Sequence, residues 1–277
     1  MTPTLLIVIP GYNVARTIED VLRQFSPATL AAVREVVFVD NCSSDDTPGI
    51  VRRLQEGGDQ LAGRLTLLRN VANYGLGGSL KIGLLYGLHR GVDYVLVIHS
   101  DKQGDSEDIA RRFIAAVAGG GPDFVMASRF MRGAQLQGYS RLRIAGNHCF
   151  NLLTLVLTGH WMSDSGCGII AVRTSLLRRL KFLGLPENFL FNPHLNVLVH
   201  DAAGVTVSEV PLRWSDPEVP SNLRVWRYLA GLTRALVQYR LNRWNLDRLD
   251  QADLTRDAHT RLKYELYAAP GAGAVSA

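Results

Sequence analysis

Short runs of apolar, β-branched residues alternate with segments of helical periodicity along the first half of the chain. The runs contain few polar positions, which is typical of strands buried on both faces of a parallel sheet. The expected strands are Leu5–Ile9, Glu35–Val39, Leu65–Arg69, Tyr94–Ile98 and Phe124–Ala127, and the expected helices are Ile18–Phe25, Pro48–Glu56, Leu80–Arg90 and Ile109–Ala118. This alternation predicts an α/β fold, with a mostly parallel central sheet and helices on both faces.

The second half of the chain is less regular. Its pattern predicts a helix over Arg141–Thr158, a loop over Ser163–Gly168 and two strands, Ile169–Val172 and Val205–Val210. A long helical stretch over Ser221–Trp244 then carries several arginines and no acidic residue. We therefore expect a main domain over 1–220, a basic amphipathic helical arm over 221–264 and a disordered, Ala/Gly-rich tail over 265–277.

Composition excludes several classes of protein. Apolar residues make up 47% of the chain and charged residues 20%, which excludes disorder as the main state and fits a globular protein. The 30 basic and 25 acidic residues give a net charge of +5. This is weaker than expected for a nucleic-acid binder, so no nucleic-acid partner is expected, but it is compatible with anionic small molecules or a membrane surface.

Cysteine spacing and the N-terminal pattern indicate a cytoplasmic protein. Cys42, Cys149 and Cys167 are far apart and form no CxxC pair, which argues against a zinc ribbon or a disulfide scaffold. The apolar run Leu5–Ile9 ends at Pro10, so it is too short for a signal peptide or a membrane span. We expect no unaided crossing of a bilayer.

Polar residues follow the first two expected strands, where parallel sheets of this kind bind ligands. Pro10, Tyr12 and Asn13 follow strand one, and Asp40 ends strand two. An Asp in this position can accept hydrogen bonds from a ribose or a base edge. The nearby Ser44, Asp45 and Asp46 have a simpler interpretation, in which Ser44 or Asp45 caps the helix that begins near Pro48.

A glycine-rich segment follows the third expected strand and contains Asn73 and Gly75. It could offer backbone N–H groups and a helix N-terminus to a phosphate. An ordinary turn at the start of a helix explains the same pattern equally well. The segment is neither a G-x-G-x-x-G fingerprint nor a phosphate loop with G-K-[ST].

The fourth strand opens onto His99, Asp101 and Gln103. These side chains would point the same way if the backbone stayed extended. Such a set can hold one Mg²⁺ or Mn²⁺ with open positions for phosphate oxygens, and a His ligand favours Mn²⁺. Asp105 is better explained as the cap of the next helix.

Several segments in this order resemble family 2 glycosyltransferases with the GT-A fold, and in particular the dolichyl- or polyprenyl-phosphate sugar synthases. The resemblance covers about residues 4 to 230. The matching segments are Ile9–Asn13, Val39–Thr47, Asn73–Gly77, His99–Gln103, Ala127–Phe130, Ser163–Gly168 and Glu209–Leu212.

The resemblance implies roles for individual residues. The nucleotide would be bound by Pro10, Tyr12, Asn13, Asp40, Asn73 and Gly75. Asp101 and Gln103 would bind a metal that bridges the diphosphate, with His99 as a further candidate ligand. Arg129 would lie near phosphates and Asp164 near the sugar or acceptor, and we count both with Asp101 as candidate catalytic residues.

The chain departs from the family pattern in places that concern the acceptor. His99-Ser100-Asp101 stands where the family has D-x-D, and the phosphate-gripping R-x-x-G-x-S-K segment is missing. Ser221 and Arg224 could take over its role. Asn192 replaces an expected acidic residue after Phe191, with His194 nearby as a further acceptor candidate.

The predicted function is metal-dependent, inverting transfer of a sugar from a UDP- or GDP-linked donor to a polyprenyl or dolichyl phosphate. A lipid phosphate is already anionic, whereas a hydroxyl acceptor would need a base, for which Asp164 is the candidate. The alternative is a soluble natural-product or sugar hydroxyl as acceptor. A non-catalytic nucleotide-sugar binder and a nucleotidyltransferase are further hypotheses. The absence of a G-x-G-x-x-G fingerprint disfavours a dehydrogenase.

Two interpretations of the basic helix over Ser221–Trp244 are equally well supported by the sequence. It could lie peripherally on the inner face of an anionic membrane, with Arg141–Thr158 as a second patch. It could instead pack on the catalytic domain with a solvated arginine face, or form a homodimer contact. Periodicity does not separate these readings.

Overall fold

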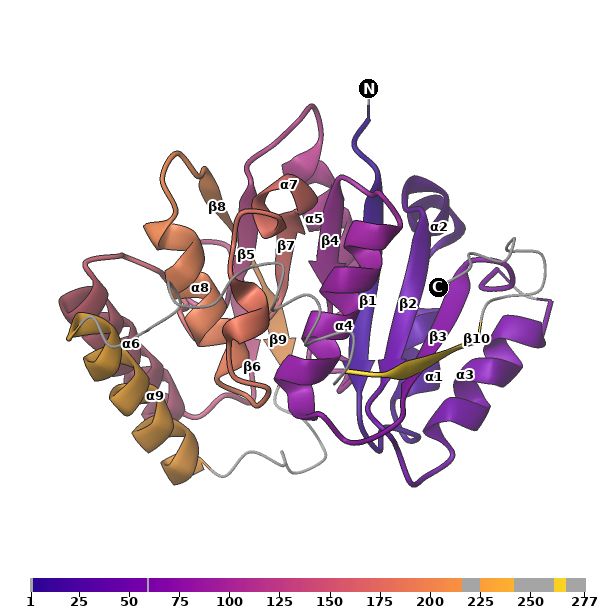
Figure 1. Cartoon of the computed structure of the whole chain (residues 1–277), viewed down its shortest axis with the longest axis horizontal. Helices are drawn as coiled ribbons and strands as arrows, with labels where there is room; N and C mark the ends of the chain where they lie inside the picture. The colour runs from indigo at the N-terminus through magenta and orange to yellow at the C-terminus, as the bar shows by residue number, and fades with distance from the viewer. Residues whose placement is uncertain (1, 59, 216–224, 242–261, 268–277) are drawn as a thin grey trace.

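The fold is organised around one mixed sheet. A computed structural model describes residues 2–58, 60–215, 225–241 and 262–267 of the chain. Within them, an eight-stranded sheet has the strand order β10-β3-β2-β1-β4-β7-β5-β8 (Figure 1), and β6 pairs with β9 in a small second sheet. The strands are β1 Leu5–Gly11, β2 Glu35–Asp40, β3 Leu65–Asn70, β4 Tyr94–Val97, β5 Phe124–Ser128, β6 Gln135–Gln137, β7 Ile170–Arg173, β8 Val207–Pro211, β9 Arg213–Ser215 and β10 Tyr264–Tyr267.

The predicted mostly parallel sheet is confirmed. Strands β3, β2, β1 and β4 run parallel, as do β5 and β8. Two strands run against them: β7 lies antiparallel between β4 and β5, and β10 pairs antiparallel with β3 at the edge. Because β7 is reversed, the loop before it reaches the same edge of the sheet as the ends of its parallel neighbours.

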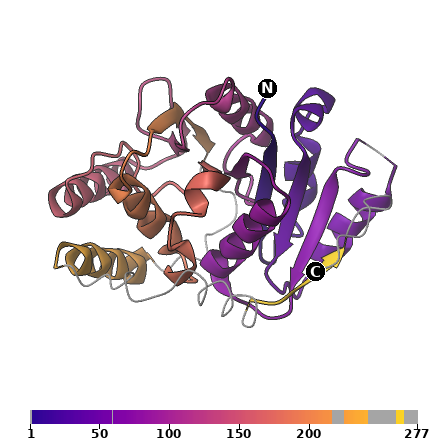
Figure 2. The same ribbon diagram turned by 45° about the horizontal axis from the view of Figure 1, so that its top comes forward.

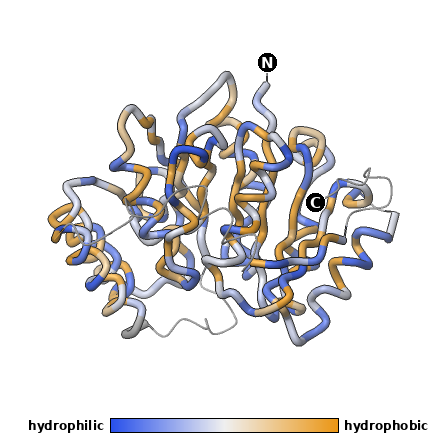
Figure 3. Tube along the Cα trace, viewed as in Figure 1, coloured by the Kyte–Doolittle hydropathy of each residue, from blue (hydrophilic) through white to orange (hydrophobic). Residues whose placement is uncertain are grey.

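Both faces of the sheet are covered, as the apolar runs predict. Leu6 and Val8 of β1 pack into one core with α4 (Gly75–His89), α7 (Thr174–Leu177) and α8 (Phe191–Asp201). Leu5, Ile7 and Ile9 pack into the other with α1 (Ile18–Arg23), α2 (Pro27–Ala32), α3 (Thr47–Glu56) and α5 (Ser106–Val117). Successive strand residues point to opposite faces, so a strand buried on both sides must be apolar throughout. Figure 3 shows this as hydrophobic colour along the central strands, and Figure 2 shows helices on either side.

The predicted helix over 141–158 has the observed bounds and the one over 48–56 begins one residue late, whereas the one from 109 begins three residues after the observed start of its helix at Ser106. The helices are α1 Ile18–Arg23, α2 Pro27–Ala32, α3 Thr47–Glu56, α4 Gly75–His89, α5 Ser106–Val117, α6 Arg141–Thr158, α7 Thr174–Leu177, α8 Phe191–Asp201 and α9 Val225–Arg240, with a 3₁₀ turn at Phe182–Gly184. The sequence analysis missed α2, α7 and α8 and began α4 too late. It also missed β6, β9 and β10. No helix among the described residues has both the length and the apolar character needed to cross a bilayer.

The C-terminal organisation differs from the predicted one in one respect. The expected boundary between the arm and the tail, at 264/265, falls inside β10, which is hydrogen-bonded to β3 and belongs to the central sheet. Residues 225–240 of the expected arm are helical, as α9. The rest of 221–264, apart from 241 and 262–264, and the tail beyond 267 lie outside the described residues.

The start of α4 is held by a close approach of two backbones. The N–H groups of Gly77 and Gly78 donate to the carbonyl of Glu187, at 2.9 and 3.3 Å. A Cβ added to Gly77 would lie 2.3 Å from the backbone oxygen of Pro186, closer than real contacts allow. Only a residue without a side chain therefore fits at this point.

We expect Gly77→Ala to destabilise the protein by about 1–3 kcal/mol, because the new methyl group must displace backbone rather than a flexible side chain. Gly146→Ala is the matched control, since Gly146 lies inside α6 and a Cβ there meets nothing within 4 Å. Alanine should raise stability there by up to ~1 kcal/mol. Urea unfolding measures both, and equal midpoints for Gly77→Ala and wild type would contradict the prediction.

Candidate active site

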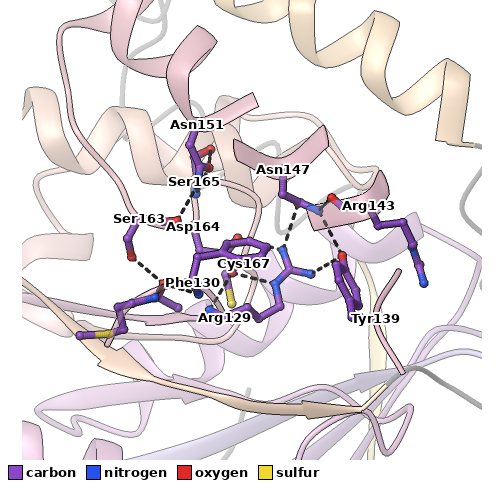
Figure 4. A network of polar contacts seen from close by, with 12 residues as sticks. Arg129, Phe130, Tyr139, Arg143, Asn147, Asn151, Ser163, Asp164, Ser165 and Cys167 are labelled. Carbon is purple, nitrogen blue, oxygen red and sulfur yellow. Dashed lines mark hydrogen bonds and ion pairs between the residues drawn. The ribbon is translucent and has the colours of Figure 1, made fainter. Parts of the chain in front are cut away.

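A buried ion pair lies where β5 ends. The Arg129 guanidinium contacts both carboxylate oxygens of Asp164, with Nε 2.7 Å from Oδ2 and Nη2 2.8 Å from Oδ1 (Figure 4). The backbone N–H of Arg129 also donates to Asp164 Oδ2, at 3.0 Å. Burial disfavours the charge of Arg129, but the Asp164 carboxylate holds its pKa above the ordinary value. The arginine is therefore a fixed cation at this edge of the sheet.

Aromatic and amide groups surround this cation. Its Nη1 lies 3.3 Å from the Tyr139 hydroxyl and its Nη2 lies 3.5 Å from Asn147 Oδ1. The guanidinium carbon is 5.4 Å from the ring centroid of Trp214. Tyr228 of α9 lies close enough to feel these charges, although burial is the main reason why its pKa rises to about 12. Sequence reasoning missed all four neighbours, because they come from β9, α6, α9 and the loop before α6.

The loop that carries Asp164 is anchored from two helices. Asn151 of α6 donates to Ser163 O at 2.6 Å and accepts from the N–H of Ser165 at 3.0 Å (Figure 4). Asn196 of α8 donates to Ser165 O at 3.1 Å. In the sequence, the only signal for this role is that Asn151 is a polar residue beside Phe150 on the side of α6 that is buried. The anchors fix Asp164 and, through it, Arg129.

His99 lies beside this loop. A Cβ at Gly168 would be 3.0 Å from His99 Nε2 and 2.3 Å from Asn192 Nδ2, so the two side chains converge on the glycine. Burial lowers the pKa of His99, the Asp101 carboxylate opposes this, and the Arg129 cation lowers it further. The imidazole is therefore neutral near pH 7, with a lone pair available to a ligand.

The backbone does not stay extended through Asp101 and Gln103, which was the condition for residues 99, 101 and 103 to point the same way. Strand β4 ends at Val97 and the backbone turns at Lys102, whose φ is +60°. The alternation of 99, 101 and 103 therefore does not apply, and their roles as metal ligands stay predictions. Asp101 is exposed, and its Oδ1 accepts only a long, 3.3 Å hydrogen bond from the N–H of Gln103.

This donor set fits a divalent cation that takes most of its ligands from a substrate. Asp101 offers an exposed carboxylate, His99 a neutral imidazole and Gln103 an amide oxygen, all within five residues of the chain. Among the described residues, no group of three or more His, Cys, Asp or Glu side chains could hold a metal by itself. A hard cation such as Mg²⁺ commonly has one or two carboxylates and completes its shell with phosphate oxygens and water.

The loops after β1 and β2 are tied to each other. Asn13, whose φ is +54°, donates its N–H to Ser43 Oγ at 2.9 Å and accepts from Ser44 N at 2.9 Å. Burial raises the pKa of Asp45, but hydrogen bonds from Thr47 and Ala15 outweigh it, and the pKa is lowered overall. The structural interpretation of Asp45, as a residue that orders the start of α3, is thus favoured.

Asp40 and Tyr12, two of the predicted nucleotide-binding residues, differ in their exposure to solvent. Tyr12 is exposed at the edge of the sheet, whereas Asp40 has no exposed area. Burial raises the pKa of Asp40, and hydrogen bonds from Ser43 and the charge of Arg69, 3.5 Å away, oppose the rise. Pro10 is buried in β1, where its carbonyl accepts a 2.8 Å hydrogen bond from Ser100 Oγ. The nucleotide-binding roles of these residues stay predictions.

The backbone N–H groups of Gly75, Gly77 and Gly78 in the glycine-rich segment already donate hydrogen bonds within the protein. The N–H of Gly75 donates to Asn73 Oδ1 at 3.0 Å, and the Asn73 side chain accepts a second hydrogen bond from Asn41. The N–H groups of Gly77 and Gly78 donate to Glu187. The structure favours an ordinary helix start over a phosphate cradle, so the direct nucleotide role predicted for Asn73 and Gly75 gains no support.

The acceptor candidates are only partly described. His194 is buried in α8; its Nδ1 lies 2.7 Å from the carbonyl of Leu190, and burial lowers its pKa. Ser221 and Arg224 lie outside the described residues. The acceptor roles predicted for these three residues stay predictions.

The fold and the site together define a class of protein. An open α/β sheet with one reversed strand brings a carboxylate, a neutral imidazole and a fixed guanidinium to one edge, as expected of a GT-A nucleotide-sugar transferase. Comparison with known families agrees: residues 6–181 match the model described as glycosyl transferase family 2. The chain belongs to this family.

Curated relatives include transferases that act on lipid phosphates. The chain is 24% identical over 184 residues to the UDP-N-acetylglucosamine–dolichyl-phosphate N-acetylglucosaminyltransferase of Methanococcus voltae, covering 64% of this chain and 72% of that protein. It is 28% identical over 214 residues to the undecaprenyl-phosphate 4-deoxy-4-formamido-L-arabinose transferase of Edwardsiella ictaluri, covering 76% of this chain and 60% of the relative. The chain thus spans about three fifths of the latter's length.

Solved structures show the same fold. Glucosyl-3-phosphoglycerate synthase of Mycobacterium tuberculosis, solved in complex with Mn²⁺, UDP and phosphoglyceric acid, matches with a TM-score of 0.59 and 21% identity, over 86% of this chain and 78% of that one. A Pyrobaculum calidifontis mannosyltransferase, solved with GDP-Man and Mn²⁺, matches with a TM-score of 0.55 and 20% identity, over 93% and 70%. Both confirm the GT-A fold.

We expect Asp164→Ala to cost about 3–5 kcal/mol of stability, because it leaves the Arg129 cation buried without its partner. Asp46→Ala is the matched control: it breaks the 2.7 Å pair with Arg53, whose side chains are both more than 60% exposed. That pair should be worth less than ~1 kcal/mol. Urea unfolding compares the two, and similar losses would show that the Arg129–Asp164 pair is not effectively buried.

Proposed function

We propose that this family 2 glycosyltransferase moves a sugar from a UDP- or GDP-linked donor to a polyprenyl or dolichyl phosphate, with inversion at the anomeric carbon and with Mg²⁺ or Mn²⁺. The observation that carries the choice of acceptor is the state of Asp164. Both of its oxygens accept hydrogen bonds from Arg129. A hydroxyl acceptor needs a base to remove its proton, whereas a phosphate oxygen is already anionic and needs none.

The reaction is a single displacement. The acceptor phosphate oxygen forms a bond to the anomeric carbon, while the bond from that carbon to the donor diphosphate breaks and its electron pair leaves with the nucleoside diphosphate. Attack in line with the leaving group inverts the anomeric centre. A bound divalent cation would supply charge neutralisation for the diphosphate, and Asp101, with His99 and Gln103, would hold it.

In this proposal the Arg129 cation also stabilises the negative charge of the departing diphosphate. Arg129 is oriented by Asp164 before any ligand arrives, so no reorganisation is required as charge develops. A preorganised guanidinium stabilises phosphate oxygens more than a mobile one does, because its position is already determined. Asp164 therefore acts as a positioning residue for Arg129 in this proposal.

A second candidate function is transfer to a soluble hydroxyl. It is favoured by the missing R-x-x-G-x-S-K segment and by the solved relative whose complex holds phosphoglyceric acid. In that case another group must serve as the base while Asp164 stays paired. The two candidates differ in whether the acceptor must carry a phosphate.

We expect a short-chain polyprenyl phosphate to accept sugar and the polyprenol of the same chain length to remain unmodified. Release of nucleoside diphosphate, measured over a panel of UDP- and GDP-sugars with Mn²⁺ or Mg²⁺, gives the donor. NMR of the product gives its anomeric configuration. Turnover with the alcohol, or with sugar hydroxyls but not with the phosphate, would support the second candidate instead.

Asp101→Asn should lower metal-dependent turnover on the order of 10²–10³-fold, because the amide cannot replace a carboxylate on a hard cation. Asp20→Asn serves as the control, since its exposed carboxylate lies nearby, 2.6 Å from Lys102 Nζ. Its turnover should match wild type. Near-normal rates for Asp101→Asn over a Mn²⁺ titration would remove Asp101 from the metal site.

A further inference from the structure

Strand β10 lies at the edge of the central sheet, next to β3 (Figure 1). It runs antiparallel to β3 and begins with Tyr264 opposite Asn70, the last residue of β3. The residues just before β10 therefore lie at the carboxyl edge of the sheet, where the parallel strands β1 and β2 also end. A segment remote in sequence thus reaches the edge at which the nucleotide is predicted to bind.

The backbone of Lys263 contacts both ends of the loop that joins β3 to α4. Its carbonyl accepts a 3.1 Å hydrogen bond from the N–H of Val71, and its N–H donates to the Tyr74 hydroxyl at 3.2 Å. The preceding residue, Leu262, is buried in the core, and its Cδ2 would lie 3.7 Å from a Cβ added to Gly78 at the start of α4. The loop over 71–74 is thus held by a neighbouring backbone that Leu262 anchors in the core.

The same loop is also tied to Asn41, the residue that follows Asp40. Asn41 Oδ1 accepts a 2.8 Å hydrogen bond from the N–H of Tyr74, and Asn41 Nδ2 donates to Asn73 Oδ1 at 2.9 Å. The backbone N–H of Asn41 donates to the carbonyl of Gly11, at the end of β1, at 2.8 Å. A continuous set of hydrogen bonds therefore runs from Lys263 through the loop to the ends of β2 and β1.

Charged side chains give β10 a second link to Asp40. Arg69, whose Nε lies 3.5 Å from Asp40 Oδ2, is directly opposite Glu265 in the register of β3 and β10. Directly opposite residues of paired strands share a face of the sheet, and opposite charges in such a pair attract each other. The Tyr267 hydroxyl donates to Glu265 Oε2 at 2.6 Å. Strand β10 therefore adds a favourable interaction with the cation that pairs with the buried Asp40.

We propose that residues 262–267, which we call the β10 clamp, hold Asp40 and Asn41 in position for the nucleotide of the sugar donor. The inference rests on the proposed function, in which that donor is a UDP- or GDP-linked sugar. A strand that only covered the edge of the sheet would need hydrogen bonds to β3 alone, whereas Lys263 extends the contact to the loop beyond β3. The clamp acts through other residues, so its members are positioning residues for the nucleotide.

Such a clamp couples nucleotide binding to the docking of β10. If the nucleotide binds more tightly when the clamp is docked, bound nucleotide favours the docked clamp by the same factor, because coupling between two equilibria is reciprocal. Five other strands separate β10 from β5, which carries Arg129 at its end. The rate of sugar transfer at saturating donor should therefore stay close to wild type when the clamp is lost.

The first test compares deletion of residues 262–277 with deletion of 268–277, which leaves β10 in place. Titration calorimetry with UDP and with GDP, each with Mn²⁺, gives the dissociation constants. We expect the longer deletion to weaken binding of the preferred diphosphate by about tenfold and the shorter one to match wild type. KM for the donor should rise by a similar factor at unchanged kcat. A purely structural strand would instead lower kcat, through loss of folded enzyme, and leave KM unchanged.

A point variant and a measurement on the full chain apply even where the longer deletion does not fold. Leu262→Ala removes the buried anchor and should also weaken diphosphate binding. Leu266→Ala is its matched control on the same strand, because Leu266 is 44% exposed, and it should bind as wild type does. In the full chain, bound diphosphate and Mn²⁺ should slow amide hydrogen exchange of peptides that cover 264–267, because opening of β10 becomes less favourable.

The outcomes separate the clamp from the proposed donor. A wild-type dissociation constant for the folded longer deletion or for Leu262→Ala would overturn the clamp and leave the donor in place. Exchange over 264–267 that the bound diphosphate does not change would overturn it in the same way. Failure of the wild type to bind either diphosphate would instead overturn the donor in the proposed function, and the clamp would lose its ligand with it.

Discussion

The ion pair between Arg129 and Asp164 is the contact on which the rest of the site depends. It joins the end of β5 to the loop before the reversed strand β7, and it is buried. Buried pairs add little net stability compared with apolar residues of the same size, because the desolvation of both charges offsets their attraction. Their value lies in fixed geometry. Here that geometry sets the direction of a cation, and Asn151 and Asn196 then maintain it by anchoring the same loop.

The same ion pair bears on the choice of acceptor and lies next to helices α6 and α9. Both carboxylate oxygens of Asp164 are held by the Arg129 guanidinium, which leaves neither of them directed at an acceptor hydroxyl. The cation also lies close to α6 and α9, since Arg129 contacts Asn147 of α6 and its charge acts on Tyr228 of α9. The acceptor in the proposed function, a lipid phosphate, needs no base because its oxygen is already anionic.

The sequence predicts the part of the fold that local pattern determines. Strand β1 is apolar throughout because both of its faces are covered, and α6 was predicted with its observed bounds because its apolar and polar positions are periodic. Long-range pairing leaves no such signal: β10 joins β3 across nearly two hundred residues, and Trp214 and Tyr228 reach Arg129 from distant segments. The alternation considered for 99, 101 and 103 required an extended backbone, but Lys102 adopts a left-handed conformation that its residue type gives no reason to expect.

Two of the buried polar atoms that lack a hydrogen-bond partner among the described residues lie beside His99. Asn192 Oδ1 and Trp214 Nε1 are buried without a hydrogen bond, and both residues lie against the imidazole or the loop beside it. Each such atom costs about 1–3 kcal/mol, so a fold selected for stability alone would replace them with apolar groups. Gly168 adds a second constraint, since any side chain there would collide with Asn192. The protein is therefore less stable than it could be at the edge of the sheet where the carboxylate, the imidazole and the fixed cation meet. A ligand that binds there can hydrogen-bond to the unpaired atoms and offset this loss of stability.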